Sequence, residues 1–124
     1  MKRLITFALL SFTLFSTVSH ASERAQVGWQ WIKQGALVVD VRTPQEFQAG
    51  HLDNAVNYPL AELHQHFDQI AKDQTVVVYC RSGNRSGQAM QYLKAQGFNQ
   101  VHNAGGLNEL LNTSSHSETA KGHE

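Results

Sequence analysis

Two short, β-branched apolar runs constrain the fold of this chain more than any other feature. They are Leu37-Val38-Val39-Asp40-Val41 and Thr75-Val76-Val77-Val78-Tyr79. Nearly continuous apolar runs of this length are typical of strands that are buried on both faces of a sheet. We therefore expect both segments to be interior strands of a sheet that helices cover on each side.

Helical patterns alternate with these strands along the chain. The other expected elements are helices over residues 25–34, 44–49, 60–71, 85–96 and 107–111, and short strands over residues 55–58 and 100–103. In the helix over residues 85–96, we expect Ala89, Met90, Tyr92 and Leu93 to be buried. The alternation predicts an α/β domain with a mainly parallel central sheet flanked by helices.

The N-terminal segment, residues 1–21, has the three-part pattern of a secretory signal peptide. Lys2 and Arg3 precede an apolar stretch without charge, and Ser19-His20-Ala21 places small residues at the cleavage positions. The alternative is an uncleaved anchor, but a membrane span needs about 20 apolar residues and this stretch is shorter. We expect a periplasmic protein, cleaved after Ala21, that has no stable association with the membrane.

The rest of the chain divides into one domain, residues 22–112, and a polar tail, residues 113–124, that we expect to be disordered. Without the signal segment, 8 basic residues stand against 10 acidic ones. No basic stripe is present, so we expect no nucleic-acid partner. His116 and His123 in the tail are weak candidates for metal ligands, but a solvated tail is the favoured interpretation. We expect neither a metal ion nor a cofactor.

Cys80 is the only cysteine of the chain. A lone cysteine in an exported protein forms no internal disulfide, and it is either a buried apolar residue or a reactive thiol. Its position favours the second interpretation, because Cys80 follows the predicted strand 75–79. Ligand sites of α/β sheets lie beyond the carboxyl ends of their strands.

A six-residue loop begins at this cysteine and leads into the next predicted helix. Its sequence is Cys80-Arg81-Ser82-Gly83-Asn84-Arg85. Gly83 and Asn84 tolerate unusual backbone angles, so the loop can curl until its N–H groups point inward as an anion cradle. These N–H groups, together with Arg81 and Arg85, are expected to lower the pKa of Cys80 from its ordinary value of about 8.5.

No histidine is an obvious general base for Cys80. Within the predicted domain, His51 and His102 are the candidates for this role. In the segment His51-Leu52-Asp53, we expect the imidazole to fix a turn, and His102 is equally compatible with the surface. We therefore expect the loop itself to activate the thiol, without a Cys-His pair.

Several motifs in order along the chain resemble the rhodanese family, over residues 26–111. The first comprises Asp40-Val41-Arg42, Glu46-Phe47, Gly50-His51-Leu52, Ala55, Asn57 and Pro59. The second is the loop from Cys80 to Ser86, and the third is Ala104-Gly105-Gly106. Asn54 stands where the family usually has glycine. A signal peptide followed by one such domain resembles the small periplasmic thiosulfate sulfurtransferases of Gram-negative bacteria.

The resemblance implies a mechanism and a set of site residues. Cys80 would take the outer sulfur of thiosulfate as a persulfide and pass it to a thiophilic acceptor, either cyanide or a thiol. The expected substrate-binding residues are Arg81, Ser82, Gly83, Asn84, Arg85 and Ser86. Either Arg81 or Arg85 would attract the anionic donor. Asp40, Arg42 and His51 are expected to support the site structurally.

Loop length separates the two main chemistries of the resembled family. Its sulfurtransferases have six loop residues, whereas the related phosphatases have seven; Cys80 to Arg85 is six. This favours sulfur transfer over a small-anion phosphatase or an arsenate reductase. A third possibility is a persulfide-carrying delivery or binding module that acts on a protein partner, and the sequence leaves that alternative open.

Overall fold

Four parallel strands form one sheet in the order β2-β1-β3-β4. The computed structural model describes residues 22–120, so the predicted signal peptide lies outside the described residues. In chain order, the elements are α1 (Glu23–Lys33), β1 (Leu37–Asp40), α2 (Pro44–Ala49), β2 (Val56–Asn57), the 3-10 helix η1 (Leu60–Glu62), α3 (Leu63–Phe67), β3 (Val76–Cys80), α4 (Asn84–Ala95), β4 (Val101–Gly106) and α5 (Leu107–Ala120). The predicted α/β architecture with a parallel sheet is confirmed.

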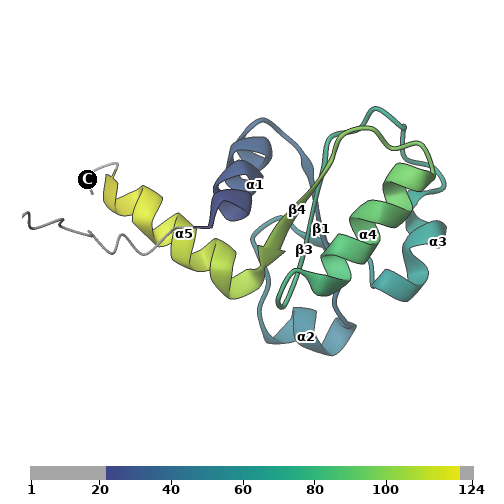
Figure 1. Cartoon of the computed structure of the whole chain (residues 1–124). Helices are drawn as coiled ribbons and strands as arrows, with labels where there is room; N and C mark the ends of the chain where they lie inside the picture. Colours follow the sequence, from purple (N-terminus) through teal and green to yellow (C-terminus); the bar gives the residue numbers. More distant parts are fainter. Residues whose placement is uncertain (1–21, 121–124) are drawn as a thin grey trace, which may run out of the picture.

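Helices cover both faces of this sheet (Figure 1), with α1 and α5 on one side and α3 and α4 on the other. The side chains of β3 alternate between two hydrophobic clusters. Val76 and Val78 pack on the α3 and α4 side, whereas Val77 and Tyr79 pack on the α1 and α5 side. All five residues of β3 are buried, as expected of a strand that is covered on both faces.

Helix α1 packs closely against strand β4 of the sheet. Gly28 faces Ala104 of β4, and a Cβ atom on Gly28 would lie only 2.6 Å from the Cβ atom of Ala104. Trp29 of α1 donates its indole N–H to the carbonyl oxygen of Leu110 at 2.9 Å. Helix α1 is thereby held against both β4 and α5.

Helix α2 begins as the sequence predicts. Thr43 is its N-cap, and its hydroxyl accepts a hydrogen bond from the Glu46 N–H while the Glu46 carboxylate accepts one from the Thr43 N–H. This reciprocal capping box satisfies backbone donors that the first helical turn leaves unpaired. Pro44 occupies the start of the helix, where its missing N–H costs nothing. The capping box also fixes the position of the Glu46 carboxylate.

Two predictions about helix length are wrong. The helix expected over residues 60–71 is instead η1 followed by α3, which ends at Phe67. The chain turns there, with the Ile70 N–H donating to the Phe67 carbonyl, and Ile70 then packs against the same core cluster as Phe67. Helix α5 continues from Leu107 to Ala120 instead of ending at residue 111. Residues 113–120 contain neither proline nor glycine, and extending a formed helix costs far less than starting one.

Residues 113–120 of the expected tail thus fall within α5, and residues 121–124 lie outside the described part of the chain. The disorder of the tail stays a prediction. Within α4, Ala89 and Leu93 are buried as predicted and Met90 packs against the core in part. Tyr92 was expected to be buried, but it is 36% exposed. It lies one position before Leu93, which turns it away from the sheet toward solvent.

Candidate active site

Cys80 is the last residue of β3, at the carboxyl edge of the sheet where the loop to α4 begins. Its side chain is fully buried. The sulfur atom accepts a hydrogen bond from the Gly83 N–H at 3.0 Å and another from the Ser86 hydroxyl at 3.3 Å. The loop thus curls back over its own first residue, as the sequence predicts for an anion cradle.

Two opposing effects act on the pKa of the Cys80 thiol. Burial raises the pKa, but hydrogen bonds from the Ser86 hydroxyl and from the backbone N–H groups of Ser86, Ser82 and Gly83 favour the thiolate. The hydrogen bonds prevail, so the pKa of Cys80 lies below its ordinary value. The cradle therefore stabilises the negatively charged form of the sulfur.

The backbone of Gly83 has a left-handed conformation, with φ of 95°, and it immediately precedes α4. A non-glycine residue would be strained at this angle. A Cβ atom would also lie 2.5 Å from the Arg24 guanidinium, which packs against this glycine. The loop conformation that brings the Gly83 N–H to the sulfur therefore requires glycine.

Asn103 of β4 connects the loop to the sheet. Its side-chain N–H donates to the Gly83 carbonyl at 3.0 Å, and its side-chain oxygen lies 2.7 Å from the Ser86 hydroxyl, for which it is an alternative acceptor to the Cys80 sulfur. The same oxygen accepts the Gly105 N–H at 3.0 Å. One amide side chain therefore joins the loop, α4 and the end of β4.

The Gly105-Gly106 pair allows β4 to approach the loop closely. β4 extends to Gly106, beyond the expected end at residue 103, and Gly106 pairs with Cys80 across the sheet. A Cβ atom on Gly106 would lie 2.2 Å from the Arg81 carbonyl oxygen. A larger residue at this position would push the cysteine loop away from β4.

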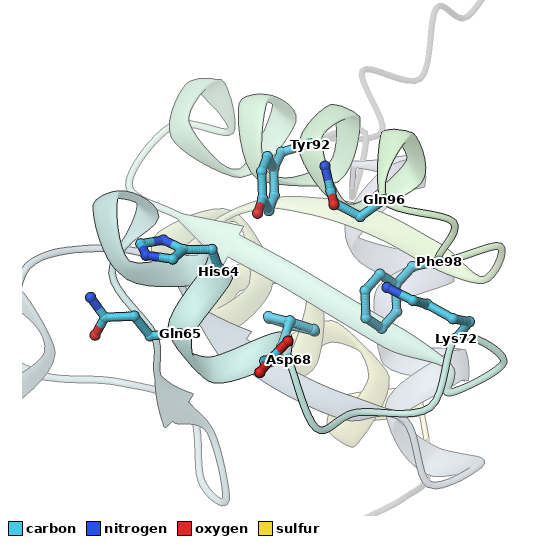
Figure 2. A pocket seen from close by; sticks show the side chains of 8 residues that line it. His64, Gln65, Asp68, Lys72, Tyr92, Gln96 and Phe98 are labelled. Atoms are coloured by element: carbon cyan, nitrogen blue, oxygen red, sulfur yellow. The ribbon is translucent and has the colours of Figure 1, made fainter.

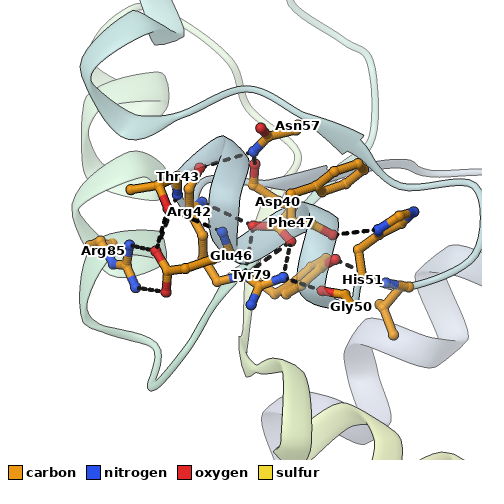
Figure 3. A network of polar contacts seen from close by, with 11 residues as sticks. Asp40, Arg42, Thr43, Glu46, Phe47, Gly50, His51, Asn57, Tyr79 and Arg85 are labelled. Atoms are coloured by element: carbon orange, nitrogen blue, oxygen red, sulfur yellow. Dashed lines mark hydrogen bonds and ion pairs between the residues drawn. The ribbon is translucent and has the colours of Figure 1, made fainter.

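Arg85 and Arg81 have different environments. Arg85 forms a two-pronged ion pair with Glu46 of α2, with N–O distances of 2.6 and 2.9 Å (Figure 3). Arg81 is exposed, and within residues 22–120 it forms no side-chain hydrogen bond or ion pair. Arg85 therefore ties α4 to α2, and Arg81 is the loop arginine whose guanidinium is available to a ligand.

Asp40 and Arg42 form a buried pair beneath the site. The Arg42 guanidinium donates to both Asp40 oxygens, with the shortest distance 2.6 Å, and it also donates to the Gly50 carbonyl. The Asn57 side chain donates to the backbone carbonyls of Asp40 and Arg42. Figure 3 shows this network around α2. The two residues support the segment between β1 and α2, and neither hydrogen-bonds to Cys80.

The side chain of His51 contacts Phe47 of α2. Its imidazole stacks on the Phe47 ring with the centroids 3.7 Å apart, and Nδ1 lies 2.7 Å from the Phe47 carbonyl oxygen. His102 lies 2.7 Å from the Arg24 carbonyl oxygen through Nε2. No histidine among the described residues hydrogen-bonds to the sulfur of Cys80.

Asn84, another expected loop residue, is exposed as the first residue of α4.

The sequence does not predict four residues of the site: Arg24, Glu46 as the partner of Arg85, Asn103 and Glu109. Arg24 of α1 and Glu109 of α5 form an ion pair at 2.7 Å beside the loop. These residues lie on elements far from Cys80 in sequence. The one usable signal was the capping box of α2, which places Glu46 but does not reveal its partner.

Other features of the surface lie away from this site. A pocket of about 390 Å³ lies between α3 and the C-terminal half of α4 (Figure 2). No residue of the loop from Cys80 to Arg85 lines this pocket. No cluster of three or more potential metal ligands exists in the described part of the chain. Among residues 22–120, no helix is long and apolar enough to span a membrane.

Comparisons with known proteins agree with this architecture. The family model of the rhodanese-like domain matches residues 25–113. Thiosulfate sulfurtransferase PspE of Escherichia coli (strain K12) is 40% identical over 74 residues, which are 58% of this chain and 71% of the relative. Thiosulfate sulfurtransferase GlpE of Ectopseudomonas mendocina (strain ymp) is 39% identical over 90 residues, which are 73% of this chain and 83% of the relative.

Solved structures are similar over the same region. A "rhodanese with anions from E. coli" has 39% identity and a TM-score of 0.56, covering 60% of this chain and 89% of that one. A rhodanese-related protein from Thermoplasma volcanium has 33% identity and a TM-score of 0.62, covering 71% and 87%. The chain therefore belongs to the family of rhodanese-like domains and is an enzyme of the rhodanese type.

Proposed function

We propose that the protein is a thiosulfate sulfurtransferase in which Cys80 carries the transferred sulfur. The relatives named as thiosulfate sulfurtransferases support this activity. The observation that carries the proposal is the cradle around Cys80, in which Gly83 and Ser86 both donate hydrogen bonds to the sulfur. A thiolate, not a thiol, is the nucleophile that attacks sulfur.

In the first half of the reaction, the Cys80 thiolate attacks the outer sulfur of thiosulfate. A new S–S bond forms, the original S–S bond breaks, and sulfite leaves with its electron pair. The product is a Cys80 persulfide with a negative terminal sulfur. In the second half, cyanide or a thiol attacks the terminal sulfur and the Cys80 thiolate is restored. Neither half needs a redox cofactor. In each half the nucleophile supplies the electron pair of the new bond, and the leaving group, sulfite or the Cys80 thiolate, takes the electron pair of the broken bond.

Burial of Cys80 favours a narrow donor, since a bulky group has no room beside a fully buried sulfur. The outer sulfur of thiosulfate is a single terminal atom and meets this requirement. The exposed Arg81 guanidinium would attract the doubly charged donor, whereas the Arg85 guanidinium is already paired with Glu46. The six residues from Cys80 to Arg85 support sulfur rather than phosphate chemistry.

Incubation of the purified protein with thiosulfate and cyanide, with colorimetric detection of thiocyanate, tests this function. We expect turnover that the Cys80→Ser variant abolishes while its circular dichroism spectrum is retained. A protein that forms thiocyanate equally well with Ser at this position would refute the role of Cys80.

Export to the periplasm, with cleavage after Ala21, is part of the same proposal. The charge and size pattern of residues 1–21 supports it. N-terminal sequencing of the protein from a periplasmic extract is expected to begin at Ser22. A mature protein that retains Met1 would contradict cleavage.

A further inference from the structure

Arg24 of α1 contacts the active loop from a distant part of the sequence. Its Nη2 atom donates a hydrogen bond to the Ser82 carbonyl oxygen at 3.0 Å. The same guanidinium lies against Gly83, where a Cβ atom would be 2.5 Å from Nη1 and 2.8 Å from Cζ. Arg24 therefore contacts both residues that form the Ser82–Gly83 peptide group.

Glu109 of α5 fixes the direction of this arginine. The Arg24 Nε and Nη2 atoms donate to its two carboxylate oxygens at 2.7 and 2.8 Å. The carboxylate also accepts hydrogen bonds from the Ser22 hydroxyl and from the Gly106 N–H. The hydrogen bond with Arg24 is the main cause that lowers the pKa of Glu109 to about 2, so this carboxylate is charged at neutral pH.

The Ser82–Gly83 peptide group connects this ion pair to the reactive sulfur. Its carbonyl oxygen accepts from Arg24, and its N–H is the Gly83 N–H that donates to Cys80 at 3.0 Å. A trans peptide is planar and its C=O and N–H point in opposite directions, so holding the oxygen also sets the direction of the N–H. A hydrogen bond accepted at the oxygen further polarises the N–H and strengthens its bond to an anion.

Because residue 83 is glycine, the Ser82–Gly83 peptide group needs such a restraint to keep its orientation. Glycine has more backbone freedom than any other residue, and the φ of 95° at Gly83 lies in the left-handed region. A peptide group flanked by this glycine can rotate at low cost unless another group holds it. On one side Asn103 holds the Gly83 carbonyl, and on the other Arg24 holds the Ser82 carbonyl.

We propose that Arg24, held by Glu109, is a positioning residue that orients the Ser82–Gly83 peptide so that its N–H stabilises the Cys80 thiolate. The charged groups around the loop are Arg24 from α1, Arg81 within the loop and Arg85 from α4, with Glu109 and Glu46 paired to the first and the last. The inference depends on the proposed function only in taking Cys80 as the reacting residue. It assigns a role in loop geometry to α1, outside the cysteine motif.

The test is the pH dependence of Cys80 alkylation by iodoacetamide in the full-length mature protein, which reports the thiol pKa without any sulfur donor. Arg24→Ala is expected to raise the pKa of Cys80 by about one unit, since a hydrogen bond to a charged group is weakened. Arg24→Lys keeps the positive charge but loses the planar fork that grips Glu109 and Ser82 together. We expect this variant to show most of the same increase.

Gln30→Ala is the matched control, because Gln30 is an exposed residue of the same helix. Its Cys80 pKa should equal that of the unmodified protein. Glu109→Gln keeps Arg24 and the shape of the side chain at position 109. It should therefore raise the pKa of Cys80 by a smaller amount than Arg24→Ala does. Thermal unfolding curves of all four variants identify any that fail to fold, and Glu109→Gln then serves as the deciding variant.

An unchanged Cys80 pKa in folded Arg24→Ala or in Glu109→Gln would overturn the proposal. An Arg24→Lys protein with an unmodified pKa, beside a raised pKa in Arg24→Ala, would also overturn it, because charge alone would then explain the effect. The failure of the proposed function is separable: a protein that accepts no sulfur from thiosulfate, yet shows the predicted alkylation shifts, would refute the function and retain this role of Arg24.

Discussion

The hydroxyl of Ser86 lies 3.3 Å from the sulfur of Cys80, in the first turn of α4. It also lies 2.7 Å from the side-chain oxygen of Asn103. A hydroxyl has one hydrogen, so it can donate to only one of these two acceptors at a time. A negative sulfur is the stronger acceptor, which means that ionisation of Cys80 directs this hydrogen toward the sulfur.

The Ser86→Ala variant should therefore raise the pKa of Cys80. Loss of a hydrogen bond to a charged group costs roughly 1.5–3 kcal/mol, which corresponds to an increase of roughly one to two pKa units. Below the raised pKa the thiolate fraction falls, and kcat/KM for thiosulfate is expected to fall by up to about tenfold for each unit of the increase. The rate should recover toward that of the unmodified protein at higher pH. A decrease of equal size at every pH would contradict this explanation.

Replacing Arg81 should weaken donor binding more than replacing Arg85. Arg81→Ala removes an exposed, unpaired charge near a doubly charged donor, so the KM for thiosulfate should rise roughly five- to tenfold. Arg85→Ala removes the partner of Glu46 and should mainly lower stability. Steady-state kinetics and thermal unfolding separate the two effects.

Lys94→Ala is the control for these charge changes, because Lys94 is exposed near the far end of α4. It alters the net charge by the same amount as either arginine variant and should leave the KM unchanged. A KM that rises in Arg85→Ala and stays constant in Arg81→Ala would reverse the roles assigned to the two arginines.

Acid should weaken two ion pairs of the fold in a defined pH range. Arg85 lowers the pKa of Glu46 to about 2, and Arg24 does the same for Glu109. Both values lie below the ordinary value of 4.5. Between pH 4.5 and pH 2, the unfolded chain therefore binds more protons than the folded chain. The free energy of unfolding decreases as the pH falls from about 4.5 toward 2.

Urea unfolding of Glu46→Gln at several pH values measures this contribution. Both pairs are partly exposed, so each is expected to contribute about 1 kcal/mol or less. The variant should show a shallower loss of stability below pH 4.5 than the unmodified protein. An identical pH dependence would show that the Glu46 pair does not contribute.

The buried pair of Asp40 and Arg42 should contribute strongly to stability. In Arg42→Met, the Asp40 carboxylate remains buried without its partner, which typically costs about 3–5 kcal/mol. The midpoint of urea denaturation should fall accordingly. Asp40→Asn combined with Arg42→Met removes both charges and should recover part of the loss. If Arg42→Met alone were as stable as the unmodified protein, this pair would have no role in supporting the β1–α2 segment.

The elements that the sequence predicts well are those with strong local signals. Strand β3 is identified by its β-branched run, α2 by its capping box, and the left-handed Gly83 by its place in the cysteine loop. Asn54 also has a positive φ, 64°, as expected of an asparagine in place of a glycine. In each case the residues themselves restrict the backbone.

The features that the sequence does not reveal depend on contacts between distant elements. In the sequence, Arg24 and Glu109 are ordinary charged residues of two amphipathic helices. Their pairing depends on the packing of α1 against α5 beside the loop. Arg85 is one of two arginines that the sequence offers as ligands for the donor, and the sequence does not reveal that Arg85 pairs with Glu46. Tyr92 fits an apolar helical pattern, but its position relative to the sheet decides its exposure. These outcomes are set by tertiary packing, which overrides local propensity.

Intact-mass spectrometry of the protein after incubation with thiosulfate tests the central claim most directly. The protein should gain the mass of one sulfur atom, peptide mapping should place it on Cys80, and cyanide should remove it. The Cys80→Ser variant should gain nothing. A protein that gains no sulfur from thiosulfate or any other sulfane donor, yet hydrolyses a phosphate ester, would contradict the account.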